Sequence, residues 1–226
     1  MKQGAVYFYC VLMSMSFLQC HRPRLAMSRK DGHLVKQLLI FPVHSQIDII
    51  EQRDKRVVSG IFSAASETGI KKELDHYIPS GIHTAYLNCG GKQEEEIRNA
   101  GIQLVKTVKR AAFVKKVEPP DLLLKMLDSL KEDYGLLVFH GGFTRTSSNF
   151  RTEYARRRTL AVASLGLYNT EPNETYSVMI GMVINKRTKR VSLYKELYWR
   201  NRDPNETVVI RSQIRDIILS YFQASK

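Results

Sequence analysis

The chain has 226 residues, which at roughly 150 residues per domain predicts a single α/β domain with appendages. Apolar residues make up 43% of the sequence and charged residues 25%, which excludes collagen-like, low-complexity and wholly disordered chains. Lysine and arginine outnumber aspartate and glutamate by 35 to 22. The resulting net charge of +13 indicates an anionic partner or surface, such as nucleic acid, an acidic glycan or lipid head groups.

An uncharged and mostly apolar stretch runs from Gly4 to Leu18, after Lys2. As a helix this stretch would reach about 22 Å, short of the ~30 Å hydrocarbon core, so residues 1–19 are predicted to be a signal peptide rather than a membrane span. Cys20 follows at once and resembles the lipid-attachment cysteine of bacterial lipoproteins. Acyl chains on this cysteine would hold the protein to a membrane.

Two other interpretations of the amino terminus stay open: plain secretion without a lipid, and an uncleaved or cytosolic amino terminus. Positive charge that follows an apolar segment opposes its translocation, and four cationic residues do so here: Arg22, Arg24, Arg29 and Lys30. Residues 20–35 are predicted to be the lipidated cysteine with a basic tether, and residues 36–226 a single α/β domain.

Predicted strands and helices alternate through the first part of this domain. The apolar run 37–43, closed by Pro42, predicts a strand covered on both faces, and a polar loop is expected over 45–56. Apolar residues at three- and four-residue spacing predict the first helix, and acidic or proline residues mark the starts of the next two. The predicted helices are 57–77, 92–104 and 119–130, and the later strands are 82–87 and 135–139.

The pattern changes in the last third of the chain. Three strand candidates follow one another, at 159–168, 176–184 and 190–199, and the polar stretch 185–189 joins the last two as a hairpin. An amphipathic helix over 210–222 closes the chain. The predicted fold is α/β, with a mixed sheet of about five to six strands packed with three to four helices, ending in a β-hairpin and a terminal helix.

Catalytic motifs are incomplete. Phe139-His140-Gly141-Gly142 resembles the oxyanion loop of lipases, but the stretch around Ser164 has valine where a nucleophile elbow needs glycine. The stretch from Cys89 to Lys92 lacks the other residues of a phosphate loop, and the histidines lack zinc-site spacing. The sequence therefore predicts no catalytic residue, metal or cofactor, and places His140 at the rim of the sheet, where Gly141 and Gly142 let the chain change direction.

Basic residues gather at three places and indicate a solvated basic face; the alternative is a surface that contacts anionic lipid or glycan at two of these places. The candidate contact residues are Arg156, Arg157, Arg158, Lys186, Arg187, Lys189 and Arg190. The third group is Lys106, Lys109, Arg110, Lys115 and Lys116. Nucleic acid is a less favoured partner, because the chain lacks a recognition motif and carries the predicted export signal.

The order of elements over about 36–222 resembles small α/β lipoprotein domains of the bacterial cell envelope. These are the amino-terminal domain of the Tol translocation protein TolB, and the curli-secretion and penicillin-binding-protein-activator lipoproteins. The resemblance is carried by the opening strand 38–43, the strand 134–138, and the hairpin of 177–185 and 190–194. It implies a non-catalytic module, anchored in the envelope through Cys20, that binds another envelope protein.

Two alternatives remain open beside that interpretation. One is an enzyme of unrecognised type, with His140, Cys89 and the polar loop 144–151 as its candidate groups. The other is a cytosolic basic protein that binds a polyanion such as nucleic acid. A cleft that brings His140 and Cys89 together would favour the enzyme.

Overall fold

The computed structural model describes residues 26–27, 32–167 and 171–222. The predicted signal peptide and Cys20 lie outside the described residues, so both remain predictions. Within the described part of the chain, no helix has the length and apolar character that crossing a membrane requires.

The described strands form one mixed sheet of eight strands. Its main path runs in the order β1, β8, β7, β6, β2 and β5, while β3 pairs with β6 and carries β4 at its outer side. The strands are β1 (Ala26–Met27), β2 (Gln37–Ile40), β3 (His44–Gln52), β4 (Lys55–Val58), β5 (His83–Tyr86), β6 (Tyr134–Arg145), β7 (Thr175–Asn185) and β8 (Arg190–Arg200).

The long central strand β6 organises the sheet. Both β2 and β3 run parallel to it, one after the other along the same side, with a bend in the chain between Ile40 and His44. On the other side β7 pairs with β6 antiparallel over the whole strand, and β8 pairs with β7 in the same way. The predicted carboxy-terminal hairpin is therefore confirmed.

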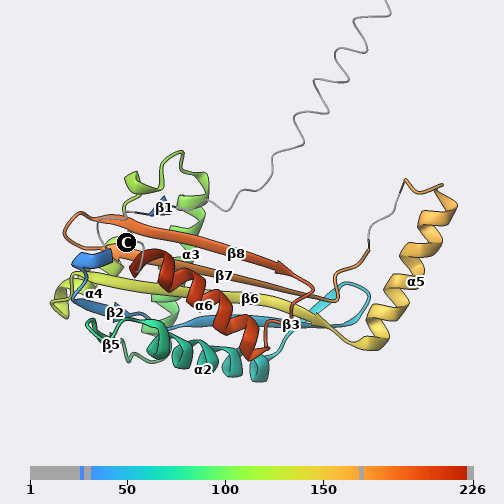
Figure 1. Cartoon of the computed structure of the whole chain (residues 1–226), viewed down its shortest axis with the longest axis horizontal. Helices are drawn as coiled ribbons and strands as arrows, with labels where there is room; N and C mark the ends of the chain where they lie inside the picture. Colours follow the sequence, from blue (N-terminus) through green and yellow to red (C-terminus); the bar gives the residue numbers. More distant parts are fainter. Residues whose placement is uncertain (1–25, 28–31, 168–170, 223–226) are drawn as a thin grey trace, which may run out of the picture.

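Helices cover both faces of the sheet (Figure 1). On one face lie α2 (Gly60–Tyr77) and α6 (Thr207–Phe222), which pack against β2, β6, β7 and β8. On the other face lie α3 (Gly91–Arg110) and α4 (Asp121–Ser129). Two short 3-10 turns, η1 (Gly32–Leu34) and η2 (Val114–Lys116), complete the body.

An apolar core on each face of the sheet explains why the central strands have unbroken runs of apolar residues. Successive side chains of a strand point to opposite faces, so Leu38 packs with α2 and α6 while Leu39 packs with α3 and α4. Because both faces are covered, polar residues at either position would be buried. The predicted α/β class with a closing hairpin and terminal helix is confirmed.

The sheet is larger than the sequence pattern indicates, because the expected polar loop 45–56 belongs largely to β3 and β4. The two strands form a hairpin that turns at Arg53, whose φ is 47°. Ile47 and Ile50 are buried, but Ser45 and Asp48 are buried with them, so the strand lacks the clean alternation of apolar and polar residues.

The strand predicted over 159–168 is wrong. Residues 159–163 belong to the helix α5 (Ser147–Ala163), which starts at Thr146 as its N-cap. No place for an extra strand exists between β6 and β7, because these two strands pair directly and Thr144 lies opposite Thr175. The intervening segment is thus excluded from the sheet, and the helical pairing of Glu153 with Arg156 and Arg157 supports α5 instead.

His140 does not lie at a rim, and Gly141 and Gly142 do not redirect the chain. β6 continues through them to Arg145, and His140 is 3% exposed in the middle of the strand. The glycine at 142 serves close packing instead, because a Cβ there would overlap the backbone oxygen of Tyr176 and contact Pro204.

Candidate functional site: a projecting arm

The helix α5 projects from one end of the body rather than packing on the sheet (Figure 1). Its buried residues, Asn149 and Glu153, both lie in its first half, and residues 154–167 contain no buried side chain. We call residues 147–167 the arm and residues 160–167 its tip. A 17-residue helix that packs so little of its surface is unusual, because helices in proteins are stabilised mainly by burial of one face.

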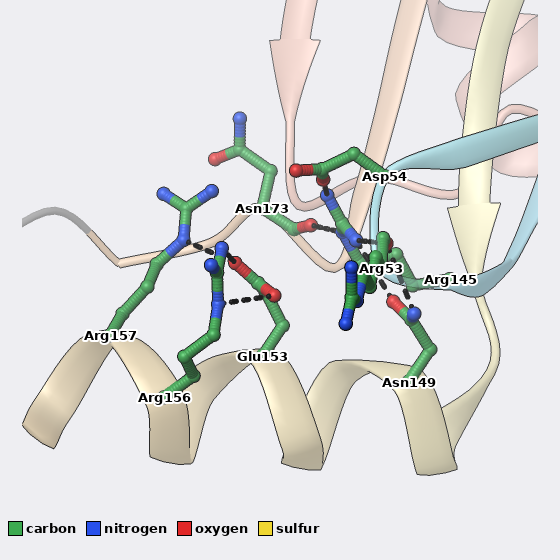
Figure 2. A network of polar contacts seen from close by, with 8 residues as sticks. All are labelled: Arg53, Asp54, Arg145, Asn149, Glu153, Arg156, Arg157 and Asn173. Carbon is green, nitrogen blue, oxygen red and sulfur yellow. Dashed lines mark hydrogen bonds and ion pairs between the residues drawn. The ribbon is translucent and has the colours of Figure 1, made fainter.

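A buried arginine joins the arm to the body (Figure 2). The side chain of Arg145, at the end of β6, is 6% exposed and lies 2.6 Å from a carboxylate oxygen of Asp54 in the β3–β4 turn. It also donates to the backbone oxygens of Arg53 and Asn173, and to the side-chain oxygen of Asn149. We call these five residues the joint.

The joint fixes the direction in which the arm leaves the body. Its members come from the β3–β4 turn, the end of β6, the first turn of α5 and the segment that leads into β7. Asn149 also donates to the backbone oxygen of Arg53, so the arm is tied to the turn by its own side chain as well as through Arg145. The hydrogen bond from Arg145, followed by its positive charge, lowers the pKa of Asp54.

Further along the arm, Glu153 is buried and paired with two arginines (Figure 2). Its carboxylate lies 2.6 Å from Arg156 and 3.1 Å from Arg157. The hydrogen bond from Arg156 is the main cause that lowers the pKa of Glu153, and Arg157 adds to it. Because one acid serves two arginines, this part of the arm keeps a net positive charge.

The tip exposes apolar side chains. Leu165 is 96% exposed and Leu167 is 86% exposed, and Val162 and Leu160 are exposed as well. Single exposed apolar residues are ordinary on protein surfaces, but a contiguous group is typical of an interaction site. A shallow surface hollow lined by Ala155, Arg158, Thr159, Val162 and Ala163 lies beside them.

The backbone at the tip is closed by its own hydrogen bonds. The amide of Ser164 donates to the oxygen of Leu160, and the amide of Gly166 donates to the oxygen of Ala161. The amide of Leu165 donates to the oxygen of Val162. Gly166, with φ of 88°, allows this turn, which is the usual ending of a helix at glycine.

The structure separates the predicted basic contact residues into two groups. Arg156, Arg157 and Arg158 lie on the arm, whereas Lys186, Arg187, Lys189 and Arg190 lie at the β7–β8 turn. The arm follows the end of β6 and the turn lies beside its beginning, so about 35–40 Å of strand separates them. At the turn, Arg187 pairs with Asp133 and Lys186 with Asp128, which reduces its positive charge.

The residues proposed for an enzyme do not meet. His140 faces α2 and α6, where its ring nitrogens lie 2.7 Å from the hydroxyl of Ser66 and 3.0 Å from that of Ser177. Cys89 packs on the opposite face of the sheet, against the core of α3 and α4. Burial lowers the pKa of His140 to about 4, so this histidine is a neutral hydrogen-bonding group of the core.

Sequence reasoning found the arginines of the arm but missed the joint that positions them. Arg145 and Asn149 fell within the polar loop 144–151, and Asp54 fell within a loop without any assigned role. Arg145 and Asp54 lie 91 residues apart in the chain. No local pattern links them, so only the pairing of β3 with β6 could have indicated their contact.

Comparisons with known proteins give distant structural neighbours. No protein-family model and no curated protein sequence matches the chain. A PelC dodecamer from Paraburkholderia phytofirmans is similar at 11% identity with a TM-score of 0.40, over 91% of this chain and 99% of that one. A variant of the same protein is similar at 9% identity with a TM-score of 0.38, over 88% and 96%. Lipoprotein GNA1162 from Neisseria meningitidis is similar at 11% identity with a TM-score of 0.33, over 80% and 96%.

Proposed function

We propose that this chain is a lipoprotein of the cell envelope that acts by binding rather than by catalysis. In this proposal Cys20 carries the acyl chains that anchor the protein, and the arm is the element through which the folded domain contacts its surroundings. The body then presents its remaining surface to another envelope protein. The proposal rests on the residues of this chain, because similarities at the level of its structural neighbours do not establish function.

The observation that carries the proposal is the arm itself. Its apolar tip is exposed, yet its base is held by a buried arginine with hydrogen bonds to four residues. Ordering a projecting helix costs conformational entropy that the arm does not recover through burial of its own. A contact that buries the tip would supply that stabilisation, and the joint keeps the tip in position to make it.

The anchor is tested by metabolic labelling of the full-length chain with a clickable fatty acid in a bacterial host. We expect the chain to take up the label and to fractionate with membranes, and we expect Cys20→Ala to lose both. Cys89→Ala is the matched control, because it removes the cysteine of the described residues while Cys20 is kept.

Two results would contradict the proposal. One is a full-length chain that stays unlabelled and soluble in the cell interior. The other is label that persists in Cys20→Ala, since the acyl chain would then be attached elsewhere. Label in both wild type and Cys89→Ala, with loss in Cys20→Ala alone, is the result that supports it.

A further inference from the structure

We propose that the tip of the arm inserts into the head-group region of an anionic bilayer, with the arginines before it on the lipid phosphates. This inference rests on the proposed function, because it names the surface that the arm contacts. It gives the domain a second membrane contact besides Cys20. Two attachments would orient the body relative to the bilayer, which attachment at a single point cannot do.

The order of residues along the arm matches the layers of a bilayer surface. Arg156, Arg157 and Arg158 form a basic segment, and the apolar tip follows after Thr159. From Arg158 to the end of the helix at Ala163 the rise is about 8 Å, at 1.5 Å per residue. Interfacial helices bury their apolar surface about 5–10 Å into the boundary between head groups and acyl chains, and the length of the tip is of the same order.

The charge of the arm suits an anionic surface. Its four arginines and single glutamate, Glu153, give it a net charge of +3. Arg151 and Arg158 are exposed, and Arg156 is exposed even while it pairs with Glu153. Basic residues beside a membrane are attracted to anionic lipids, and each strengthens the association about fivefold.

The apolar residues of the tip surround the helix rather than forming a stripe. Leu160 and Val162 are two residues apart, so they lie on nearly opposite sides of α5, and both are exposed. A helix that docks in a protein groove shows apolar anchors at three- and four-residue spacing. An all-round apolar tip fits an environment that is apolar on every side, which the acyl chains of a bilayer provide.

The backbone hydrogen bonds of the tip reduce the penalty for such an insertion. Unpaired carbonyl groups are costly in hydrocarbon, because no water is present to hydrogen-bond them. At the tip the backbone oxygens of Leu160, Ala161 and Val162 accept bonds from amides within the tip itself. The hydroxyl of Ser164, the polar side chain inside the tip, donates to the oxygen of Ala161.

Insertion is tested by tryptophan fluorescence in the full-length chain. Trp199 is the chain's single tryptophan, so Trp199→Phe removes the native tryptophan fluorescence. A probe introduced by Leu165→Trp then supplies the whole tryptophan signal. The protein is bound to vesicles of brominated phosphatidylcholine, either alone or mixed equally with phosphatidylglycerol. We expect the probe at 165 to be strongly quenched in the mixed vesicles and several times less in the neutral ones.

A probe at Leu130→Trp is the matched control. Leu130 is also exposed, but it precedes β6 whereas the arm follows that strand, so it lies at the other end of the sheet. We expect little quenching there in either vesicle. Equal quenching at positions 165 and 130, or the same quenching at 165 in vesicles with and without phosphatidylglycerol, would overturn the proposal.

Charge variants test the arginines of the arm without removing a partner of Glu153. We expect Arg151→Gln with Arg158→Gln to lower the insertion equilibrium about fivefold for each arginine removed. Lys186→Gln with Lys189→Gln removes the same charge at the distant β7–β8 turn and should leave insertion unchanged. Equal effects of the two pairs would show a response to net charge alone, and the arginines would then have no specific role.

Two further measurements separate the possible failures. In Cys20→Ala, the probe at 165 should still respond to added anionic vesicles, because insertion of the tip does not need the acyl chain. An unlabelled wild-type chain would therefore contradict the proposed function without altering this result. A photo-crosslinking residue in place of Leu165 reports on a protein partner in cells. Crosslinking to a protein, without quenching of the tryptophan at 165 by brominated lipid, would show that the tip binds a protein and that the bilayer proposal is wrong.

Discussion

The guanidinium of Arg145 and the carboxylate of Asp54 lie 2.6 Å apart, and this contact joins the end of the central strand to the β3–β4 turn at the base of the arm. The arginine side chain is almost fully buried while Asp54 is largely exposed. Removing the arginine would therefore leave the buried side-chain oxygen of Asn149 without this donor and break the link between four segments, whereas removing Asp54 would cost less.

The first prediction concerns this joint. We expect Arg145→Gln to lower the free energy of unfolding by about 2–3 kcal/mol, because four hydrogen bonds from a charged donor are lost and the acceptor oxygen of Asn149 stays buried. Trypsin should also cleave faster at the arginines of the arm. Arg98→Gln is the control, because Arg98 forms a pair with Glu95 on an exposed helix surface, where such pairs contribute about 0–1 kcal/mol. Unchanged cleavage in Arg145→Gln would show that the joint does not hold the arm.

The second prediction concerns acid. The arginines lower the pKa values of Asp54 and Glu153. The two ionised carboxylates therefore stabilise the fold above the ordinary carboxyl pKa, and this stabilisation is lost as the pH falls through the lowered pKa values. We expect amide hydrogen exchange in α5, corrected for intrinsic rates, to speed up below pH 4 more than exchange in α6. Glu153→Gln should remove much of this acid response. Equal acceleration in both helices would contradict a local effect.

The third prediction concerns His140. Its pKa is about 4 in the folded protein, whereas an unperturbed histidine has a pKa of about 6.5, so the unfolded chain binds a proton first as the pH falls. Stability is therefore lost between pH 6.5 and pH 4, and by about 2 kcal/mol between pH 7 and pH 5. Urea unfolding at the two pH values measures this loss. His140→Gln should show a smaller difference than wild type, while the exposed His83→Gln should resemble wild type.

The fourth prediction concerns the contact of α6 with the sheet. A Cβ at Gly181 in β7 would overlap the side chain of Ile217. We expect Gly181→Ala to lower the free energy of unfolding by about 1–3 kcal/mol, as overpacked cores do. Gly60→Ala, at the start of α2, meets nothing within 4 Å and should be neutral or slightly stabilising. Thermal unfolding of both variants checks the contrast, and an equal loss would show that packing is not the cause.

Local patterns predicted most elements of the body but not its full sheet. Pro42 correctly marks the end of a buried strand, and the acids before Ile97 correctly mark the start of α3. β3 was missed because Ser45 and Asp48 interrupt its apolar residues, and Ser45 is buried through contacts with elements distant in the chain. Ser45, for example, donates to Ser66 of α2.

The sequence by itself determined the α/β class, the closing hairpin and the basic character of residues 156–158. These follow from residue spacing and composition, which act over a few residues. The tertiary structure decided that residues 159–163 are helical, that His140 is buried and that Arg145 meets Asp54. Each of these depends on which strands pair. The direct pairing of β6 with β7, for example, excludes the intervening segment from the sheet and leaves it to project as the arm.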